Sequence, residues 1–225
     1  MKKQLEKWRI KPLKEEVTKI KIKNKQFTLK TKKNEKTFKT LIIATGTIPK
    51  EITIPIEKKL VGKQVFYEIK NILNKIKPGK ECIVIGGGDA AFDYSLNLAD
   101  KKIKVHLFFR SKKPRCLPLL EERAKKHDMI NIYPSHNLSN ICETDGKPEV
   151  KFRYNKKNKT YSSDFVLIAC GRKPNNDLLK DITKNNISRV YIAGDVKTGR
   201  YRQTGIAVGE GIYAAMKTEQ YLRGK

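Results

Sequence analysis

A glycine-rich turn near the middle of the chain is the strongest candidate for chemistry. The turn consists of Gly86, Gly87, Gly88, Asp89, Ala90 and Ala91, which fill the pattern G-x-G-x-x-A. The first glycine of such a pattern permits a tight turn, the second lets backbone N–H groups approach a diphosphate, and the alanine lets a helix pack closely on a strand. An apolar strand is expected before the turn and a helix over 89–99 after it, with its positive end toward the phosphates. The sequence therefore predicts a dinucleotide site; the alternative is a structural turn without a ligand.

A basic loop follows the next expected strand, which covers 104–109. The loop reads Arg110-Ser111-Lys112-Lys113-Pro114-Arg115. NAD sites typically place an acid here to accept the ribose hydroxyls, and this loop has none. Arg110 and Arg115 can chelate a 2′-phosphate, with Lys112 or Lys113 assisting as point charges. NADP(H) is therefore favoured over NAD(H), the alternative being one more basic loop in a basic protein.

The elements that must position these residues alternate between strands and helices. Residues 17–40 alternate apolar side chains with lysines, which predicts a three-stranded antiparallel meander with one solvated face. Buried strands are expected over 41–44, 83–85, 165–169 and 190–193, and a further strand over 130–133. A short helix is expected within 65–76, longer ones over 119–127 and 205–222, and a second meander over 138–165. This alternation predicts an α/β doubly wound architecture.

The chain is strongly basic, with 50 Lys and Arg against 23 Asp and Glu and a formal net charge of +27. Most of the excess is lysine, spread along the whole sequence. Nucleic-acid surfaces rely on arginine and interleaved aromatic residues, and no nucleic-acid-binding motif is present. The charge is therefore attributed first to compositional bias, then to an acidic protein partner, and last to nucleic acid.

The four cysteines, Cys82, Cys116, Cys142 and Cys170, form no C-x-x-C pair and no cluster with zinc spacing, so no metal site is expected. Cys82 and Cys170 lie beside apolar strands and are expected to be small buried residues. The N-terminal residues contain no apolar signal core, and no run reaches the roughly 18 apolar residues of a membrane helix. A cytoplasmic location is therefore expected, where structural disulfides are rare.

Five motifs together resemble one family. They are Ala44-Thr45-Gly46, the glycine turn, Gly171-Arg172-Lys173-Pro174-Asn175, Ala193-Gly194-Asp195 and Arg202-Gln203-Thr204-Gly205-Ile206-Ala207. Their order and spacing resemble the thioredoxin-reductase-like flavoproteins, which are FAD- and NAD(P)-dependent pyridine nucleotide oxidoreductases and include ferredoxin–NADP reductases of that type. The resemblance covers the chain from Val17 onward and implies NADP(H) and FAD as cofactors.

The resemblance also implies roles for individual residues. Thr45 and Gly46 belong to the first crossing between the FAD and NAD(P) domains, and Gly171 and Arg172 to the second. Gly194 and Asp195 match the turn that holds the ribityl and diphosphate region of FAD. Arg202, Gln203 and Thr204 match the segment along the flavin ring, where the N-terminus of the following helix stabilises the anionic reduced flavin. The family's arginine-rich segment matches Arg110 and Arg115, but its middle arginine is Ser111 here.

The domain organisation follows from the same resemblance. A Rossmann-like, three-layer NAD(P)-binding domain over 55–171 is expected to be inserted into a partial FAD-binding domain with β-meanders. The two parts of that FAD domain are 1–54 and 172–225. Hinges are expected near 47–55 and 171–174.

Two departures from the family pattern bear on function. Residues 65–70, where thioredoxin reductases carry C-x-x-C, contain no cysteine, and a disulfide relay needs two neighbouring thiols. The family's first FAD-binding βαβ unit, with its own G-x-G-x-x-G, is also absent from the sequence. We therefore expect an N-terminally truncated chain with an incomplete FAD site: a fragment, a protein completed by a second polypeptide, or one that has lost FAD.

The favoured function is a flavin-dependent oxidoreductase that passes hydride from NADPH to FAD and electrons to an acceptor that is not a disulfide. An acidic carrier such as ferredoxin suits the basic surface, and a homodimer is compatible with the family. The cofactors carry the chemistry, so no catalytic side chain is expected, and His106, His127 and His136 are expected to be structural or surface residues. The alternative is a truncated or split-enzyme subunit that binds NADP(H) without independent catalysis.

Overall fold

A computed structural model describes residues 2–23, 26–183, 189–199 and 201–224. The chain divides into two compact units, each of which is described by itself. Unit 1 comprises Met1–Ile48 and Lys173–Lys225, and unit 2 comprises Pro49–Arg172. The assignment of FAD and NAD(P) to domains bounded near 54 and 171 stays a prediction. Among the described helices, none is long and apolar enough to cross a membrane.

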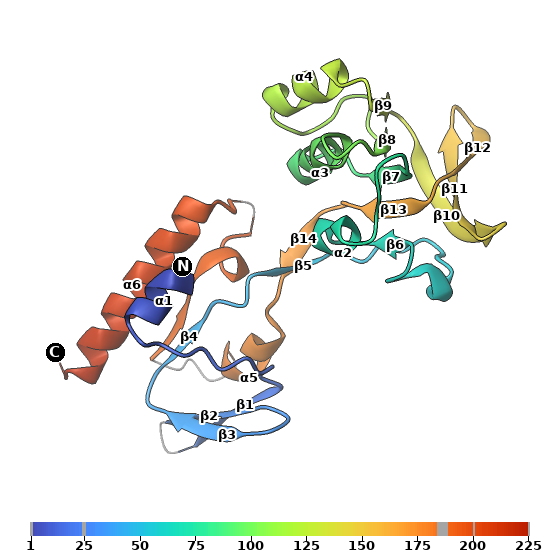
Figure 1. The fold of residues 1–225 in the computed structure, drawn as a ribbon. Helices are drawn as coiled ribbons and strands as arrows, with labels where there is room; N and C mark the ends of the chain where they lie inside the picture. Colours follow the sequence, from blue (N-terminus) through green and yellow to red (C-terminus); the bar gives the residue numbers. More distant parts are fainter. Residues whose placement is uncertain (1, 24–25, 184–188, 200, 225) are drawn as a thin grey trace. The chain divides into compact units, whose positions relative to one another are not determined.

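Unit 2 is built on a five-stranded parallel sheet with the strand order β6-β13-β7-β8-β9 (Figure 1). The strands are β6 Val65–Phe66, β7 Glu81–Ile85, β8 Lys104–Phe108, β9 Ile130–Tyr133 and β13 Phe165–Ile168. A connection between parallel strands needs a crossover, usually a helix. The helices of this unit are α2 Ile69–Leu73, α3 Asp89–Ala99 and α4 Pro118–Lys126.

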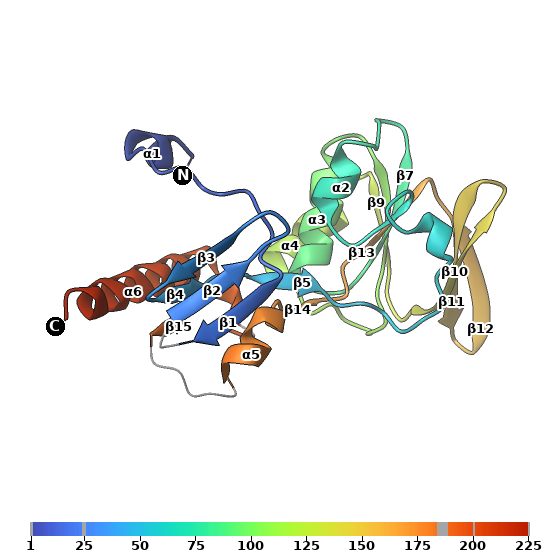
Figure 2. The same cartoon turned by 90° about the horizontal axis from the view of Figure 1, so that it is seen from below.

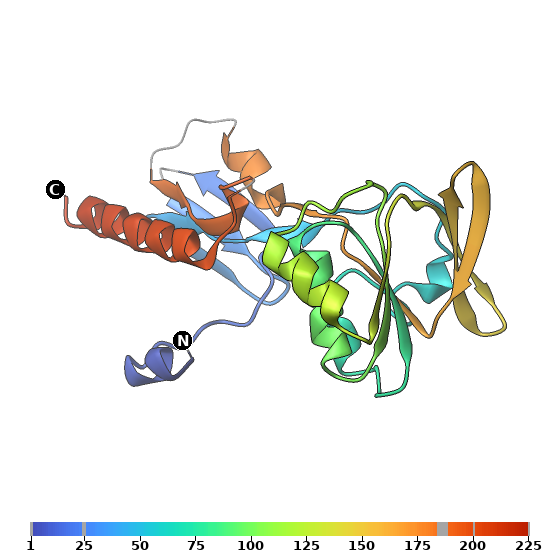
Figure 3. The ribbon, with the colours of Figure 1, turned by 90° about the horizontal axis from the view of Figure 1, so that it is seen from above.

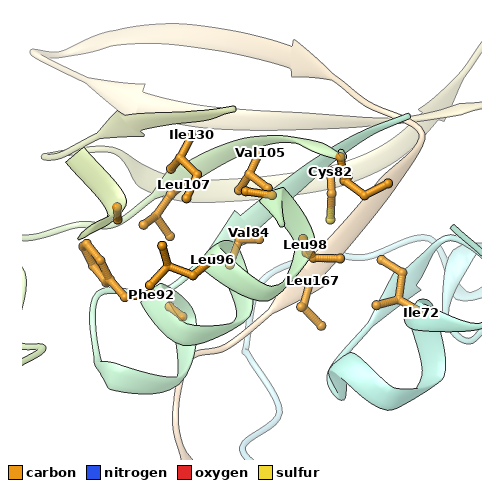
Figure 4. Close-up of a cluster of buried hydrophobic side chains, with 14 of the residues drawn as sticks. Ile72, Cys82, Val84, Phe92, Leu96, Leu98, Val105, Leu107, Ile130 and Leu167 are labelled. Carbon is orange, nitrogen blue, oxygen red and sulfur yellow. The ribbon is translucent and has the colours of Figure 1, made fainter. Parts of the chain in front are cut away.

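Alternate residues of β7 serve two separate cores, because successive side chains of a strand point to opposite faces. Cys82 and Val84 pack with the helices, as Figure 4 shows for Phe92 and Leu96 of α3. Ile83 and Ile85 pack on the other face against the meander β10–β12 (Figure 2). Its strands are β10 Asn137–Thr144, β11 Lys147–Tyr154 and β12 Lys157–Ser162. Unit 2 thus has three layers, and the predicted Rossmann-like α/β class is confirmed.

Unit 1 contains a three-stranded antiparallel meander and a two-stranded parallel sheet. The meander strands are β1 Lys19–Lys23, β2 Gln26–Lys30 and β3 Glu35–Phe38, and the parallel pair is β4 Leu41–Ile43 and β15 Val190–Ile192. The helices are α1 Lys2–Lys7, α5 Lys180–Thr183 and α6 Thr204–Leu222, and one-turn 3-10 helices cover Asp177–Leu179 and Gly194–Val196. A small core joins β1, β4 and the segment before β15, with Ile20, Ile43 and Ile182 at its centre.

A further two-stranded sheet pairs β5 (Thr47–Pro49) with β14 (Arg172–Pro174), where the chain passes between the units. The sequence did not indicate these strands, because three residues containing a proline give no periodic signal.

Two predictions of burial are wrong. Cys170 is exposed, because it lies beyond the end of β13, whereas Cys82 is fully buried inside β7. The strand over 41–44 is not buried throughout: Ile42 is 40% exposed. Its face of the two-stranded sheet is covered only in part by α6, which the neighbouring Tyr191 contacts through a hydrogen bond to the Lys217 carbonyl.

Candidate functional site

The glycine turn links β7 to α3 and is held against two neighbouring strands. The Gly86 N–H donates to the Phe108 carbonyl oxygen over 2.9 Å. Gly86 has φ +151°, and a Cβ built there would lie 2.4 Å from the carbonyl oxygen of Ala169. The same Cβ would lie 3.0 Å from that of Ala91, which is fully buried. Glycine and alanine at these two positions are therefore required by close packing between strand and helix.

The N-terminus of α3 offers backbone donors to an anion. Gly88 is the N-cap residue and forms no side-chain cap. A Cβ built at Gly88 would meet nothing within 4 Å, so the space beside this backbone is open. The 11-residue helix beyond it presents its first N–H groups and positive dipole end, the arrangement that suits a phosphate.

The basic loop after β8 is folded onto this turn. The Arg115 N–H donates to the Gly87 carbonyl over 2.6 Å, and the Leu117 N–H donates to Asp89 Oδ1 over 2.8 Å. Asp89, which was predicted to bind the cofactor, is thus engaged in holding the loop. Arg110, Lys112, Lys113 and Arg115 are all exposed, and within the described part of the chain none of them forms an ion pair. The structure brings the glycine turn and a cluster of available cations together in unit 2.

The end of β13 brings further predicted residues to the same edge of the sheet. Cys170 Sγ donates to the Ile85 carbonyl over 3.5 Å, beside the glycine turn. Although the residue as a whole is exposed, partial desolvation of its sulfur raises the pKa of this thiol, and the positive charge of Arg110 opposes the rise. Arg172 Nη1 pairs with Glu68 Oε1 at 2.6 Å. Sequence reasoning predicted Arg172 but missed Glu68, which lies more than a hundred positions away in the chain.

Unit 1 contains the second group of predicted residues. Because β4 and β15 are parallel, their carboxyl ends bring Thr45 and Gly46 to the same edge as Gly194 and Asp195. The Thr45 hydroxyl donates to the Asn175 carbonyl over 2.6 Å. The Asn175 N–H in turn donates to the Gly46 carbonyl over 2.9 Å.

Glu210 of α6 fixes the turn after β15 and was not predicted. The Gly194 N–H donates to Glu210 Oε2 over 2.6 Å, and Lys197 Nζ lies 3.3 Å from Oε1. Gly194 has φ +77°, a conformation that favours glycine. The sequence signal for Glu210 was a single acid within the apolar stretch 206–216 of this helix.

The residues Arg202, Gln203 and Thr204 lie at the start of α6. Gln203 is its N-cap residue, without a side-chain cap, and its carbonyl accepts from the Ala207 N–H over 3.0 Å. Gln203 and Thr204 are exposed and Arg202 is half-buried. This helix has 19 residues, so a second N-terminus with a strong dipole is open to a ligand, here in unit 1.

The histidines lie outside both groups. His106 Nε2 is 3.1 Å from Glu81 Oε2, and His136 Nδ1 is 2.7 Å from the Pro134 carbonyl oxygen. His127 Nε2 lies 3.5 Å from Asp100 Oδ1. Over the described residues, no group of His, Cys, Asp and Glu could hold a metal ion.

Comparison with known proteins gives consistent matches. A family model described as pyridine nucleotide-disulphide oxidoreductase matches residues 5–197. The "34.2 kDa protein in rubredoxin operon" of Clostridium pasteurianum is 29% identical, over 93% of this chain and 73% of its own length. A thioredoxin reductase of Chlamydia pneumoniae is 26% identical, over 99% of this chain and 78% of its own.

Solved structures agree with these relatives. The thioredoxin reductase of Lactococcus lactis superposes with a TM-score of 0.84 at 25% identity, over 94% of this chain and 75% of that one. The thioredoxin reductase of T. acidophilum gives a TM-score of 0.79 at 26% identity, over 90% and 72% of the two chains.

Proposed function

We propose a function from the family to which the chain belongs, the thioredoxin-reductase-like branch of the pyridine nucleotide-disulphide oxidoreductases. The protein is a flavin-dependent NADPH oxidoreductase whose acceptor is not a disulfide. FAD, held by residues of unit 1, would supply the hydride acceptor for the nicotinamide and the electron donor for the final acceptor. The observation that carries the proposal is the basic loop held on the glycine turn by the 2.6 Å bond between Arg115 and Gly87.

The proposed roles in unit 2 follow from the donors available there. The first turn of α3, with Gly87, Gly88 and Ala90, binds the diphosphate through backbone N–H groups. Arg110 and Arg115 bind the 2′-phosphate, for which a guanidinium offers paired donors. An NAD(H) enzyme would be expected to carry a carboxylate at this loop, and the loop has none.

The proposed roles in unit 1 rest on the parallel ends of β4 and β15. Gly194 and Asp195, fixed by Glu210, are suited to the diphosphate and ribityl part of FAD. The open N-terminus of α6, with Gln203 and Thr204, is suited to the flavin ring, where its dipole favours an anionic reduced ring.

The acceptor is proposed to be an acidic electron-carrier protein. The sequence contains no C-x-x-C, which a disulfide relay of the thioredoxin reductase kind needs. The Clostridium relative is a protein of a rubredoxin operon, and rubredoxin is an electron carrier. A chain with a net charge of +27 would steer an acidic carrier to its surface.

The test is spectroscopic. We expect the purified chain, titrated with FAD, to acquire a flavin absorption band that NADPH bleaches without oxygen, and NADH bleaches much more slowly. Charge removal in Arg115→Ala should slow bleaching by NADPH, whereas Lys157→Ala on the exposed meander strand β12 should not. A flavin-loaded protein that NADPH fails to reduce would refute the proposal.

The second candidate is a subunit that binds NADP(H) but has no independent catalysis. The sheet on which the proposed FAD site rests, β4 and β15, has only two strands among the described residues. So small a sheet offers limited support for FAD, which favours this second candidate. A colourless chain that still binds NADPH with FAD in excess would favour this candidate over the self-sufficient enzyme.

A further inference from the structure

A hollow of about 350 Å³ lies beside α2, in unit 2. It is bordered by the turn before β6, by β6 itself and by the outer side of α2, through Gly62, Phe66, Lys70, Asn71, Asn74 and Lys75. Of these described residues, two carry a positive charge, two carry a carboxamide and none is an acid. None of them belongs to the proposed sites for the nucleotide or the flavin.

The apolar pattern of α2 explains why its polar side chains gather on one side. Apolar side chains at helical spacing pack in the core of unit 2: Ile69, Ile72 and Ile76. The helical hydrogen bonding extends past Leu73, so the spacing continues to the end of the hollow. Lys70 and Asn74, like Asn71 and Lys75, are four positions apart and therefore lie one above the other, away from the core.

Lys75 is held in place at the hollow. Its Nζ donates to the Gly62 carbonyl oxygen over 2.8 Å and lies 4.9 Å from the centre of the Phe66 ring. Gly62 has φ +79°, and its N–H donates to the Val65 carbonyl, so the turn is fixed with the Gly62 carbonyl toward the lysine. An ammonium group has three N–H donors, so this one keeps donors for a ligand.

The positive charge of the hollow has no counter-ion in the described part of the chain. Neither Lys70 nor Lys75 forms an ion pair there, whereas Lys80 and Lys104 of the same unit pair with acids at 3.3 Å and 3.0 Å. Two like charges that share one hollow repel each other. A bound anion would replace this repulsion with attraction, so the ligand that fits is negatively charged.

The donors suit a phosphate better than a carboxylate. The side chains of Asn71 and Asn74 form no hydrogen bond with other described residues, and each carboxamide offers two N–H donors. A phosphate monoester has three terminal oxygens and a charge of about −1.5 to −2 at pH 7, which matches two ammonium groups and two carboxamides. A carboxylate has only two oxygens and a single charge. Lysine binds phosphate well as a point charge.

The hollow is separate from the glycine turn. It borders β6, which is the edge strand of the parallel sheet, and β13 lies between β6 and β7, the strand that leads into the glycine turn. Figures 1 and 3 show α3 between α2 and α4, the helix that follows the basic loop. A ligand in the hollow would therefore not share the donors proposed for the nucleotide.

We propose that this hollow binds a small phosphate monoester, with Lys70 and Lys75 as its charge partners and Asn71 and Asn74 as its hydrogen-bond donors. The proposal goes beyond the proposed function and does not rest on it, because it involves neither the nucleotide nor the flavin.

The probe is glycerol 3-phosphate, titrated into the full 225-residue chain with NADP⁺ in excess to fill the proposed nucleotide site. We expect saturable binding by calorimetry and shifts of the Asn71 and Asn74 side-chain amide signals in NMR spectra. Lys70→Ala and Lys75→Ala should each raise the Kd about tenfold or more, as expected for a lost charge-assisted hydrogen bond. Lys77→Ala, which removes an exposed charge outside the hollow, should raise it by less than about twofold.

Three results would overturn the proposal: no saturable binding, equal losses in Lys70→Ala and Lys77→Ala, or equal affinity for succinate at the same ionic strength. Binding that Arg115→Ala abolishes and Lys70→Ala preserves would place the phosphate at the glycine turn and would also overturn it. Lys70 is exposed, so Lys70→Ala should leave folding intact, as circular dichroism can verify. Reduction of flavin by NADPH tests the proposed function separately, and its failure would leave this titration unaffected.

Discussion

Gly86 is tightly packed, whereas Gly88, two residues later, faces open space. Substitutions at the two positions should therefore affect different properties, stability at Gly86 and ligand binding at Gly88. An alanine at Gly86 meets the Ala169 carbonyl at 2.4 Å with φ at +151°, so Gly86→Ala should lower the free energy of unfolding of unit 2 by roughly 2–4 kcal/mol. An alanine at Gly88 meets nothing within 4 Å and should cost less than about 1 kcal/mol, as a change of N-cap residue.

If the diphosphate binds where we propose, the Gly88→Ala methyl group should obstruct it and raise the Kd for NADPH about tenfold or more, a change of about 1.4 kcal/mol. Urea denaturation and calorimetric titration measure the two effects. An unchanged Kd in Gly88→Ala would place the nucleotide elsewhere.

Asp164 is a carboxylate whose charge stabilises unit 2. Burial alone would raise its pKa, but hydrogen bonds from the Glu81 N–H, Lys147 and Lys80 outweigh burial and lower the pKa overall. Because the pKa is lower in the folded state, the stabilisation is present above the ordinary carboxyl range and is lost as the pH falls through the folded pKa. Asp164→Asn should therefore cost about 1–2 kcal/mol at pH 7, and the difference from the native chain should shrink below about pH 4.

Urea midpoints of both proteins across this pH range provide the measurement. Asp177→Asn is the matched control, because Asp177 pairs with Lys180 in solvent and exposed pairs contribute little. Equal pH dependence in Asp164→Asn and the native chain would contradict this account.

At the scale of elements, the loop between β8 and α4 should decide between NADPH and NADH. Arg110→Ala and Arg115→Ala should each raise the Kd for NADPH by about tenfold to a hundredfold, as expected when a charge-assisted contact to phosphate is lost. The Kd for NADH should change by less than about twofold, and added salt should weaken NADPH binding in the native chain more than in either variant.

Calorimetric titration of both nucleotides into each variant tests this, with Lys157→Ala as the control for a general loss of positive charge. Equal losses of affinity for NADPH and NADH would contradict a contact with the 2′-phosphate. The arginines would then bind the diphosphate, which both nucleotides share, or stabilise the folded loop.

Sequence patterns predicted most elements because their signals are local. The helix over 89–99, for example, is found at those bounds, and the strand over 130–133 likewise. The pairs Glu68–Arg172 and Gly194–Glu210 were missed because each joins residues that only the fold brings together. Cys170 was misassigned because an apolar strand beside a cysteine does not reveal where the strand ends. The sequence was sufficient to predict the backbone turns of the site. It was not sufficient to predict the side chains, such as Glu68 and Glu210, that form hydrogen bonds or ion pairs with residues in or near those turns.

At the scale of the whole molecule, the two units differ in the size of their cores. Among the described residues, the core of unit 1 is one small cluster around Ile20, Ile43, Leu179, Ile182 and Val196. Unit 2 has two larger clusters, one on each face of its parallel sheet. Apolar burial contributes about 25 cal/mol per Å², so the unit that buries less apolar surface should be the less stable one.

We therefore expect thermal unfolding in two transitions, the lower one belonging to unit 1. Hydrogen exchange should be fast at β4 and β15 and slow at β7 and β8, because local stability follows buried contact. NADPH at a hundred times its Kd should stabilise the upper transition by about 2.7 kcal/mol and leave the lower one unchanged, since a ligand stabilises only what it binds. Differential scanning calorimetry with and without NADPH measures both.

A single transition that NADPH shifts as a whole would mean that the units unfold together despite their separate cores. Unit 1 would then owe its stability to unit 2.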